Sequence, residues 1–168
     1  MAKIKVKLQD LHDLYLEQLR DLYSAETQLL KALPKMAASA TDPDLKQGFE
    51  DHLVQTQEQV GRLEGLFQDL EQDPGGHTCQ AMLGLVKEGE EMIREKAAPA
   101  VKDAGLIAVA QRIEHYEIAG YGTVAAYADL LGLERQAMVL RTTLEEEKET
   151  DARLTLAARE INVEAAEG

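Results

Sequence analysis

Apolar residues recur at intervals of three and four positions along most of this chain, which is the period of amphipathic α-helices. The pattern breaks at residues that form turns or stop helices, around Pro43, Pro74, Pro99 and Gly132. We therefore predict five helices, at about residues 8–40, 43–72, 79–96, 103–131 and 134–162. Asp103 is expected to cap the start of the fourth helix, just after the break at Pro99.

The order of these helices predicts the fold. Two long helices come first, a connection holding one short helix follows, and two more long helices complete the chain. Short links within each half predict antiparallel hairpins, and a single long crossover between two hairpins is the connectivity of ferritin-like bundles. We expect an all-α fold, namely one ferritin-like antiparallel four-helix bundle over residues 1–168 with the short fifth helix in its crossover.

Several charged or polar residues occupy positions in the apolar stripes where a core residue is expected. Glu26 lies four residues after Leu22 and four before Leu30, in the middle of the first stripe. An ideal helix turns about 100° per residue, so these three side chains share one face. The same test on all four long helices finds six residues on the inward faces whose side chains commonly bind metals. They are Glu26, His52, Glu114, Glu117, Glu147 and Asp151.

This set of residues predicts a metal site. A buried carboxylate without a partner costs several kcal/mol or becomes protonated, and the stripes that carry these residues hold no lysine or arginine. Divalent cations would neutralise the carboxylates directly. Because an oxygen-rich site with one imidazole suits iron or manganese better than zinc or copper, we predict two iron ions per chain, with manganese as the second choice.

Each candidate also has a purely structural interpretation. Asp151 lies where an edge position would let it reach water, and a single histidine such as His52 is often only hydrogen-bonded. Gln55 and Gln59 are candidates for neutral ligands or for donors behind the ligands. Tyr121 is either a hydrogen-bond donor to a liganding carboxylate or a core tyrosine.

Net charge and composition limit the possible partners. The formal charge of −13 argues against nucleic acid and anionic membranes. No apolar run approaches the roughly 20 residues needed to span a bilayer. The single cysteine, Cys79, cannot form an intramolecular disulfide, and no secretion signal is visible at the N-terminus. A cytoplasmic location is therefore expected.

Short segments spread over most of the chain carry a family resemblance. The most specific is 111–119, which contains Glu114 and Glu117, and the others lie at 11–15, 21–26, 52–56, 79–85 and 144–151. Together they resemble the YciE/YciF-type ferritin-like stress proteins of bacteria over about residues 8–162. The resemblance implies a rubrerythrin-like four-helix bundle, frequently a homodimer, that acts in stress responses without an established biochemical activity.

The wider ferritin-like pattern fits this chain only in part. The glutamate that it expects on the first helix corresponds to Glu26, and Glu114 and Glu117 resemble the rubrerythrin pair. On the second helix the pattern expects Glu-x-x-His, where this chain has Phe49 and His52. The histidine expected after the glutamate of the last helix is replaced by an aspartate. These departures weaken an expectation of ferroxidase or peroxidase turnover more than one of metal binding.

Two functions are therefore open. The first is a di-metal carboxylate protein of bacterial stress which, if it is an enzyme, is a peroxidase- or oxidase-like oxidoreductase. The alternative is a non-enzymatic stress module with a vestigial metal site, acting through oligomerisation or partner binding. The glutamate missing from the second helix favours this alternative.

We further predict a homodimer. The long helices carry more apolar stripe than one partner helix covers, and closed two-fold pairs are the commonest soluble oligomers. The crossover helix adds Met82, Leu83, Leu85, Val86 and Ile93. Light scattering at micromolar protein should give about twice the 18.5 kDa mass of one chain, and a mass of one chain would contradict the prediction.

Overall fold

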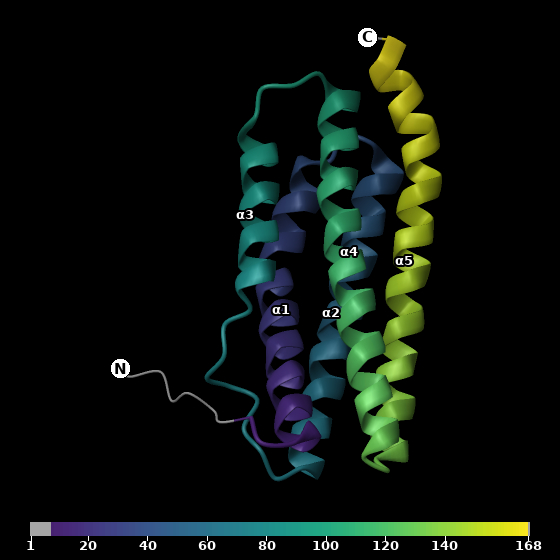
Figure 1. The fold of residues 1–168 in the computed structure, drawn as a ribbon. Coiled ribbons are helices and arrows are strands. Elements are labelled where there is room, and N and C mark those ends of the chain that lie inside the picture. The colour runs from purple at the N-terminus through teal and green to yellow at the C-terminus, as the bar shows by residue number, and fades with distance from the viewer. Residues whose placement is uncertain (1–7, 168) are drawn as a thin grey trace.

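The computed structural model describes residues 8–167 and contains, in that range, five helices and no strand (Figure 1). The helices are α1 (Leu11–Ser39), α2 (Pro43–Asp69), α3 (Gln80–Arg94), α4 (Pro99–Leu130) and α5 (Glu134–Glu167). The all-α class and the order of four long helices and one short helix are confirmed. The single domain over 1–168 stays a prediction, and its residues 1–7 and 168 lie outside the described part.

The four long helices form the bundle, and the short helix covers one side of it. α1 pairs with α2, α4 pairs with α5, and α1 and α2 of the first hairpin contact α4 and α5 of the second, respectively. α3 lies against α1 and α4, on the side of the molecule opposite α5 (Figure 1). No helix in residues 8–167 is both long and apolar enough to cross a membrane. This arrangement leaves α1, α2, α4 and α5 to enclose a common interior.

Side-chain caps set the starts of the first two helices. A carboxylate oxygen of Asp10 accepts a 2.9 Å hydrogen bond from the Asp13 N–H, so α1 begins at residue 11 rather than at 8. Asp42 accepts a 2.8 Å bond from the N–H of Leu45, and Pro43 occupies the first helical position, where its missing N–H costs nothing. Asp42 and Pro43 together explain why α2 begins so soon after α1 ends at Ser39.

The prediction that Asp103 caps the fourth helix is wrong. α4 begins four residues earlier, at Pro99, because proline is well suited to the first helical position. Asp103 is instead 2% exposed within the helix. Its carboxylate accepts bonds of 2.8 and 2.5 Å from the N–H and hydroxyl of Thr41 and one of 2.8 Å from the Asp42 N–H. It therefore fastens the α1–α2 turn to α4.

Two helix ends use a left-handed residue. At Gly132, which has φ of 71°, α4 closes with a 2.8 Å bond from the Leu133 N–H to the Ala128 carbonyl, as the predicted stop at this glycine requires. α2 closes in the same way at Glu71, with φ of 54°, and so ends before the expected residue 72. α5 continues past the expected residue 162, through good helix formers, to Glu167.

Cys79 joins the crossover to the bundle. Its Sγ accepts from the N–H of Met82 at the start of α3, and its own N–H donates to Ser24 Oγ at 2.9 Å. The thiol also lies 3.0 Å from the hydroxyl of Tyr116, which in turn donates to Asp21. Burial raises the pKa of the Cys79 thiol, which keeps it protonated. Cys79 thus begins a helix, as expected, and also connects α3 to α1 and α4.

The bundle interior consists of two apolar cores with a polar layer between them. One core includes Leu29, Phe49, Ile113 and Leu154, and the other includes Leu22, Leu63, Tyr121 and Leu140. On each long helix, buried polar side chains lie near the point where the members of one core are followed by the members of the other. These are Glu26 on α1, His52, Thr56 and Gln59 on α2, Glu114 and Glu117 on α4, and Thr143, Glu147 and Thr150 on α5.

The role of Asp103 gives a stability prediction. Asp103→Asn should destabilise the fold by about 2 kcal/mol, because hydrogen bonds to a charged group are each worth roughly 1.5–3 kcal/mol and an amide cannot accept all three. Asp69→Asn is the control, since its side chain is 39% exposed and pairs only with Arg135 on the surface. Thermal unfolding measures both, and an equal, small loss in the two variants would contradict this role.

Candidate metal centre

Five predicted ligands meet in the polar layer. Glu26, His52, Glu114, Glu117 and Glu147 come from all four long helices, and each is at most 4% exposed. Their positions follow from the helical period, since each lies within the inward stripe of its helix between residues of the two cores. The apolar cores therefore shield the layer from water on the two sides where they flank it.

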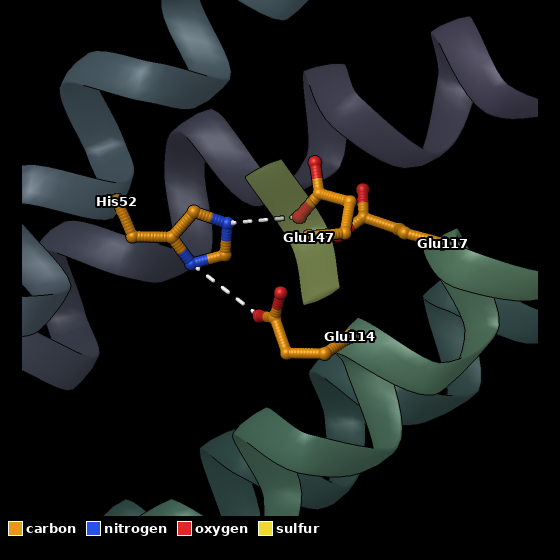
Figure 2. A group of neighbouring side chains, drawn as sticks. All are labelled: His52, Glu114, Glu117 and Glu147. Atoms are coloured by element: carbon orange, nitrogen blue, oxygen red, sulfur yellow. Dashed lines mark ion pairs between the residues drawn. The ribbon is translucent and has the colours of Figure 1, made fainter. Parts of the chain in front are cut away.

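Four of these residues form a compact group. One donor atom each from His52, Glu114, Glu117 and Glu147 lies within 4.8 Å of all the others. Figure 2 shows the imidazole between two of the carboxylates, with Nδ1 3.4 Å from Glu114 and Nε2 3.7 Å from Glu147. These separations are longer than hydrogen bonds. The donor atoms of the four residues therefore lie close together, and His52 forms no hydrogen bond with Glu114 or Glu147.

Glu26 lies beside this group and is held by a tyrosine. The Tyr121 hydroxyl donates a 2.5 Å hydrogen bond to Glu26 Oε1. Burial, and then the charge of Glu147, raise the pKa of Glu26 well above its ordinary value. Burial and the charge of Glu26 likewise raise the pKa of Tyr121, so its hydroxyl stays protonated and remains a donor. Tyr121 is thus both a core tyrosine and a hydrogen-bond donor to Glu26.

A second set of contacts orients Glu147 from the α2 side. Gln59 Nε2 donates at 2.5 Å to Glu147 Oε1 and at 3.1 Å to Glu146. Glu146 also binds both terminal nitrogens of Arg62, at 2.5 and 2.8 Å. Partial burial opposes ionisation of Glu146, but the bonds from Arg62 and Gln59 lower its pKa. Arg62 is thus neutralised outside the layer by Glu146.

The glutamates of the layer lack enough partners to be stable as anions. Burial, and next the charge of Glu147, raise the pKa of Glu114, while burial and the charge of Glu26 raise the pKa of Glu117. Within residues 8–167, no hydrogen bond reaches one oxygen each of Glu26 and Glu147, both oxygens of Glu114 and Glu117, or Nε2 of His52. Buried polar atoms without partners are rare in folded proteins.

Asp151 lies outside this group. Its side chain is 21% exposed, accepts a 3.1 Å bond from Gln111 and lies 3.4 Å from a ring nitrogen of His115. The pattern of α5 places Asp151 one turn beyond Glu147 on the same stripe, but at the margin, where water and surface residues reach it. Asp151 therefore remains a candidate ligand only from the edge of the site.

Sequence reasoning missed the pair of Arg62 and Glu146. Gln59 was a candidate donor, and the structure shows that it donates to Glu147. Arg62 follows Gln59 by three residues, and Glu146 precedes Glu147, so both lie beside recognised positions. Arg62 lies on α2 and Glu146 on α5, and the apolar stripe of one helix does not show which residues of another helix it contacts. Gln55 lies farther out, where its carbonyl accepts a 3.3 Å bond from Thr150.

The donor set fits divalent iron or manganese better than zinc or copper. It comprises carboxylate oxygens and one imidazole, and hard, oxygen-rich sites suit iron and manganese whereas structural zinc takes thiolates or several histidines. The only cysteine, Cys79, lies beside Tyr116 and not in the layer. The glutamate oxygens without a hydrogen-bond partner are the atoms that a cation would bind.

The fold and its buried carboxylate layer define a ferritin-like helical bundle protein. A family model described as "Domain of unknown function (DUF892)" matches residues 10–167. The chain belongs to this family, which has a ferritin-like fold. The family resemblance seen in the sequence is therefore confirmed.

Two relatives are similar to the chain over nearly its whole length. Protein YciF of Escherichia coli (strain K12) is 41% identical over 162 residues, covering 95% of this chain and 98% of that protein. The crystal structure of E. coli YciF, described as a stress protein, matches with a TM-score of 0.89 over 92% of this chain and 98% of that one. YcfI from Rhodopseudomonas palustris, named as a candidate structural protein, has 45% identity and a TM-score of 0.86 over the same shares.

The raised pKa values of Glu26, Glu114 and Glu117 predict how the metal-free protein responds to pH. Unfolded glutamates ionise near pH 4.3, so above this value the native state binds more protons than the unfolded chain and loses stability as pH rises. The melting temperature of metal-free protein should rise from pH 8 to about pH 5, and roughly 2–4 °C corresponds to 1 kcal/mol at this chain length.

A pair of double variants tests the cause of this response. Glu114→Gln/Glu117→Gln removes two buried charges, so it should melt above metal-free wild type at pH 8 and flatten the pH response. Glu145→Gln/Glu149→Gln, at exposed positions of the same bundle, should do neither. A flat wild-type curve, or equal behaviour of the two double variants, would show that these carboxylates are not a strained buried group.

Proposed function

We propose that this chain is a metal-binding protein of bacterial stress whose polar layer binds two divalent ions, with iron as the first choice and manganese as the second. The ligands are His52 and the glutamates of the layer, and Asp151 assists from the edge; the full set is Glu26, His52, Glu114, Glu117, Glu147 and Asp151. A stress role is supported by the similarity to E. coli YciF, which is described as a stress protein.

One observation carries this proposal: three buried glutamates and His52 bring donor atoms within 4.8 Å of one another, and Glu26 is buried beside them. No lysine or arginine of residues 8–167 pairs with any of these four glutamates. An ionised carboxylate removed from water carries a desolvation penalty of several kcal/mol after relaxation. Protonation of every glutamate would relieve the repulsion but would leave the orphaned oxygens unpartnered. Cations satisfy both requirements, because they neutralise the charge and bind the free oxygens.

Two ions also account for the shape of the layer better than one. Four residues supply donors within 4.8 Å of one another, whereas Glu26 lies beside them and interacts with Glu117 and Glu147. Carboxylates that bridge two ions use both oxygens and distribute the charge, as in the ferritin-like di-metal proteins. Glu114, Glu117, Glu147 and His52 would therefore hold the ions together with Glu26 of α1, and the ions would neutralise the carboxylates.

The reaction class that fits is reduction of peroxide or oxygen, for which bound iron or manganese would supply the electrons. The protein's own residues orient the ligands. Tyr121 holds one oxygen of Glu26 and leaves the other free, and Gln59 does the same for Glu147. The apolar cores on both sides exclude water from the layer. These contacts keep the carboxylates in place before an ion arrives.

A non-enzymatic role is the second candidate, and Phe49 favours it. Phe49 is 2% exposed and belongs to an apolar core, so the second helix provides no glutamate one turn before His52. A layer with fewer ligands would bind metal less tightly or serve only structure. The R. palustris relative, named as a candidate structural protein, is compatible with this role. The homodimer and the cytoplasmic location remain predictions in either case.

Metal content distinguishes the two candidates. Protein purified without chelators should contain up to two iron or manganese ions per chain, and Glu26→Ala or Glu147→Ala should lose most of both, because each removes a ligand that neighbours cannot replace. Glu145→Ala, an exposed residue of the same helix as Glu147, is the control and should retain its metal. Elemental analysis makes the measurement. Wild-type metal content in both ligand variants would refute the site.

A further inference from the structure

A cavity of about 430 Å³ opens between α2 and α5, in the range typical of small-molecule sites. Its walls come from the first half of α2 and the second half of α5. This is where the bundle is most loosely closed, because α2 contacts α5 less extensively than α1 contacts α2 or α4 contacts α5. In Figure 1, α5 forms the outer edge of the molecule, with α4 beside it and α2 behind α4.

The cavity reaches the polar layer at His52 and Thr150, and His52 is the one proposed metal ligand that lines it. His52 is among its lining residues, whereas Glu26, Glu114, Glu117 and Glu147 are not. Those four glutamates are 0% exposed and His52 is 4% exposed. Nε2 of His52 has no hydrogen-bond partner among the described residues. His52 is therefore the proposed metal ligand that an ion in this cavity would contact first.

The cavity is lined by exposed charged residues at its rim and by less exposed, uncharged polar residues farther in. Exposed acidic residues lie on both helices, Asp44 and Asp51 on α2 and Glu160 on α5, and Arg153 is the one cationic lining residue. Arg153 lies 3.6 Å from Glu149 outside the cavity lining, which offsets its charge. Gln55 and Thr150, hydrogen-bonded to each other across the two helices at 3.3 Å, lie beside the buried end.

We propose that this α2–α5 cavity is the route by which divalent metal ions enter and leave the buried layer. The inference rests on the proposed metal function and specifies how ions reach it. The acidic rim concentrates cations from solution, and His52 receives them. Much of the remaining wall is apolar, including Leu154 and Leu156, and it provides no binding strong enough to hold an ion in transit.

Filling the cavity tests this route. Gly48 lines it, and an added Cβ there would meet no atom within 4 Å, so Gly48→Phe adds a bulky side chain at the cavity wall without a clash at its Cβ. Gly61→Phe is the matched control, because Gly61 is exposed on the same helix, has the same free space and does not line the cavity. Both changes remove a helical glycine, so their effects on helix propensity are similar.

Metal-free protein is mixed with cobalt(II), and its visible absorbance follows ligation while elemental analysis gives the final content. Gly48→Phe should load roughly ten times more slowly than wild type to the same final content, because the ion must wait for a local opening of the helices. Gly61→Phe should load like wild type. Loading of Gly48→Phe at the wild-type rate overturns the route alone. If wild type takes up no cobalt, the metal function fails and the route fails with it.

Removing the rim charges provides a second test that leaves the cavity open. Asp44→Asn/Asp51→Asn/Glu160→Gln should load several-fold more slowly at low salt, and added salt should abolish the difference from wild type. The control is Glu88→Gln/Glu91→Gln/Glu95→Gln, which removes the same charge from α3 and the residue after it, on the opposite side of the bundle. Equal loading rates in the two triple variants would overturn the role of the rim.

Discussion

The burial of like charges at the middle of the bundle is the constraint on which the rest of this structure depends. Glu26, Glu114, Glu117 and Glu147 lie together without a cationic side chain among the described residues to neutralise them. The metal-free fold must therefore offset a repulsive, poorly solvated layer with the apolar packing on either side. With divalent ions bound, the same residues would join four helices to one centre, and the binding energy would stabilise the native state.

Several features of the fold hold the helices together despite this repulsion. The two apolar cores flank the layer, so the helices are held together on both sides of the repelling charges. Tyr121 and Gln59 each bind one oxygen of a glutamate and leave the other oriented inward. Polar contacts of Cys79 fix the crossover, and polar contacts of Asp103 fix the α1–α2 turn. The ligand positions thus rest on a rigid frame.

The sequence predicts the helices and the buried glutamates because both follow from the helical period. Glu26 and Glu147 are visible as acidic residues within apolar stripes, and no neighbour in space is needed to find them. The contact of Arg62 with Glu146 and the true role of Asp103 depend on which helices lie side by side, so the stripes do not contain them. The early end of α2 depends on one left-handed residue, Glu71, whose type does not favour that conformation.

The most direct test of a metal-filled layer is anomalous diffraction from crystals of the protein grown with manganese(II), with data collected on both sides of the manganese absorption edge. We expect two anomalous peaks per chain, about 3.5–4 Å apart as in other two-metal sites. They should be surrounded by Glu26, His52, Glu114, Glu117 and Glu147. Peaks confined to surface carboxylates, or a layer that remains free of anomalous signal at saturating manganese, would contradict it.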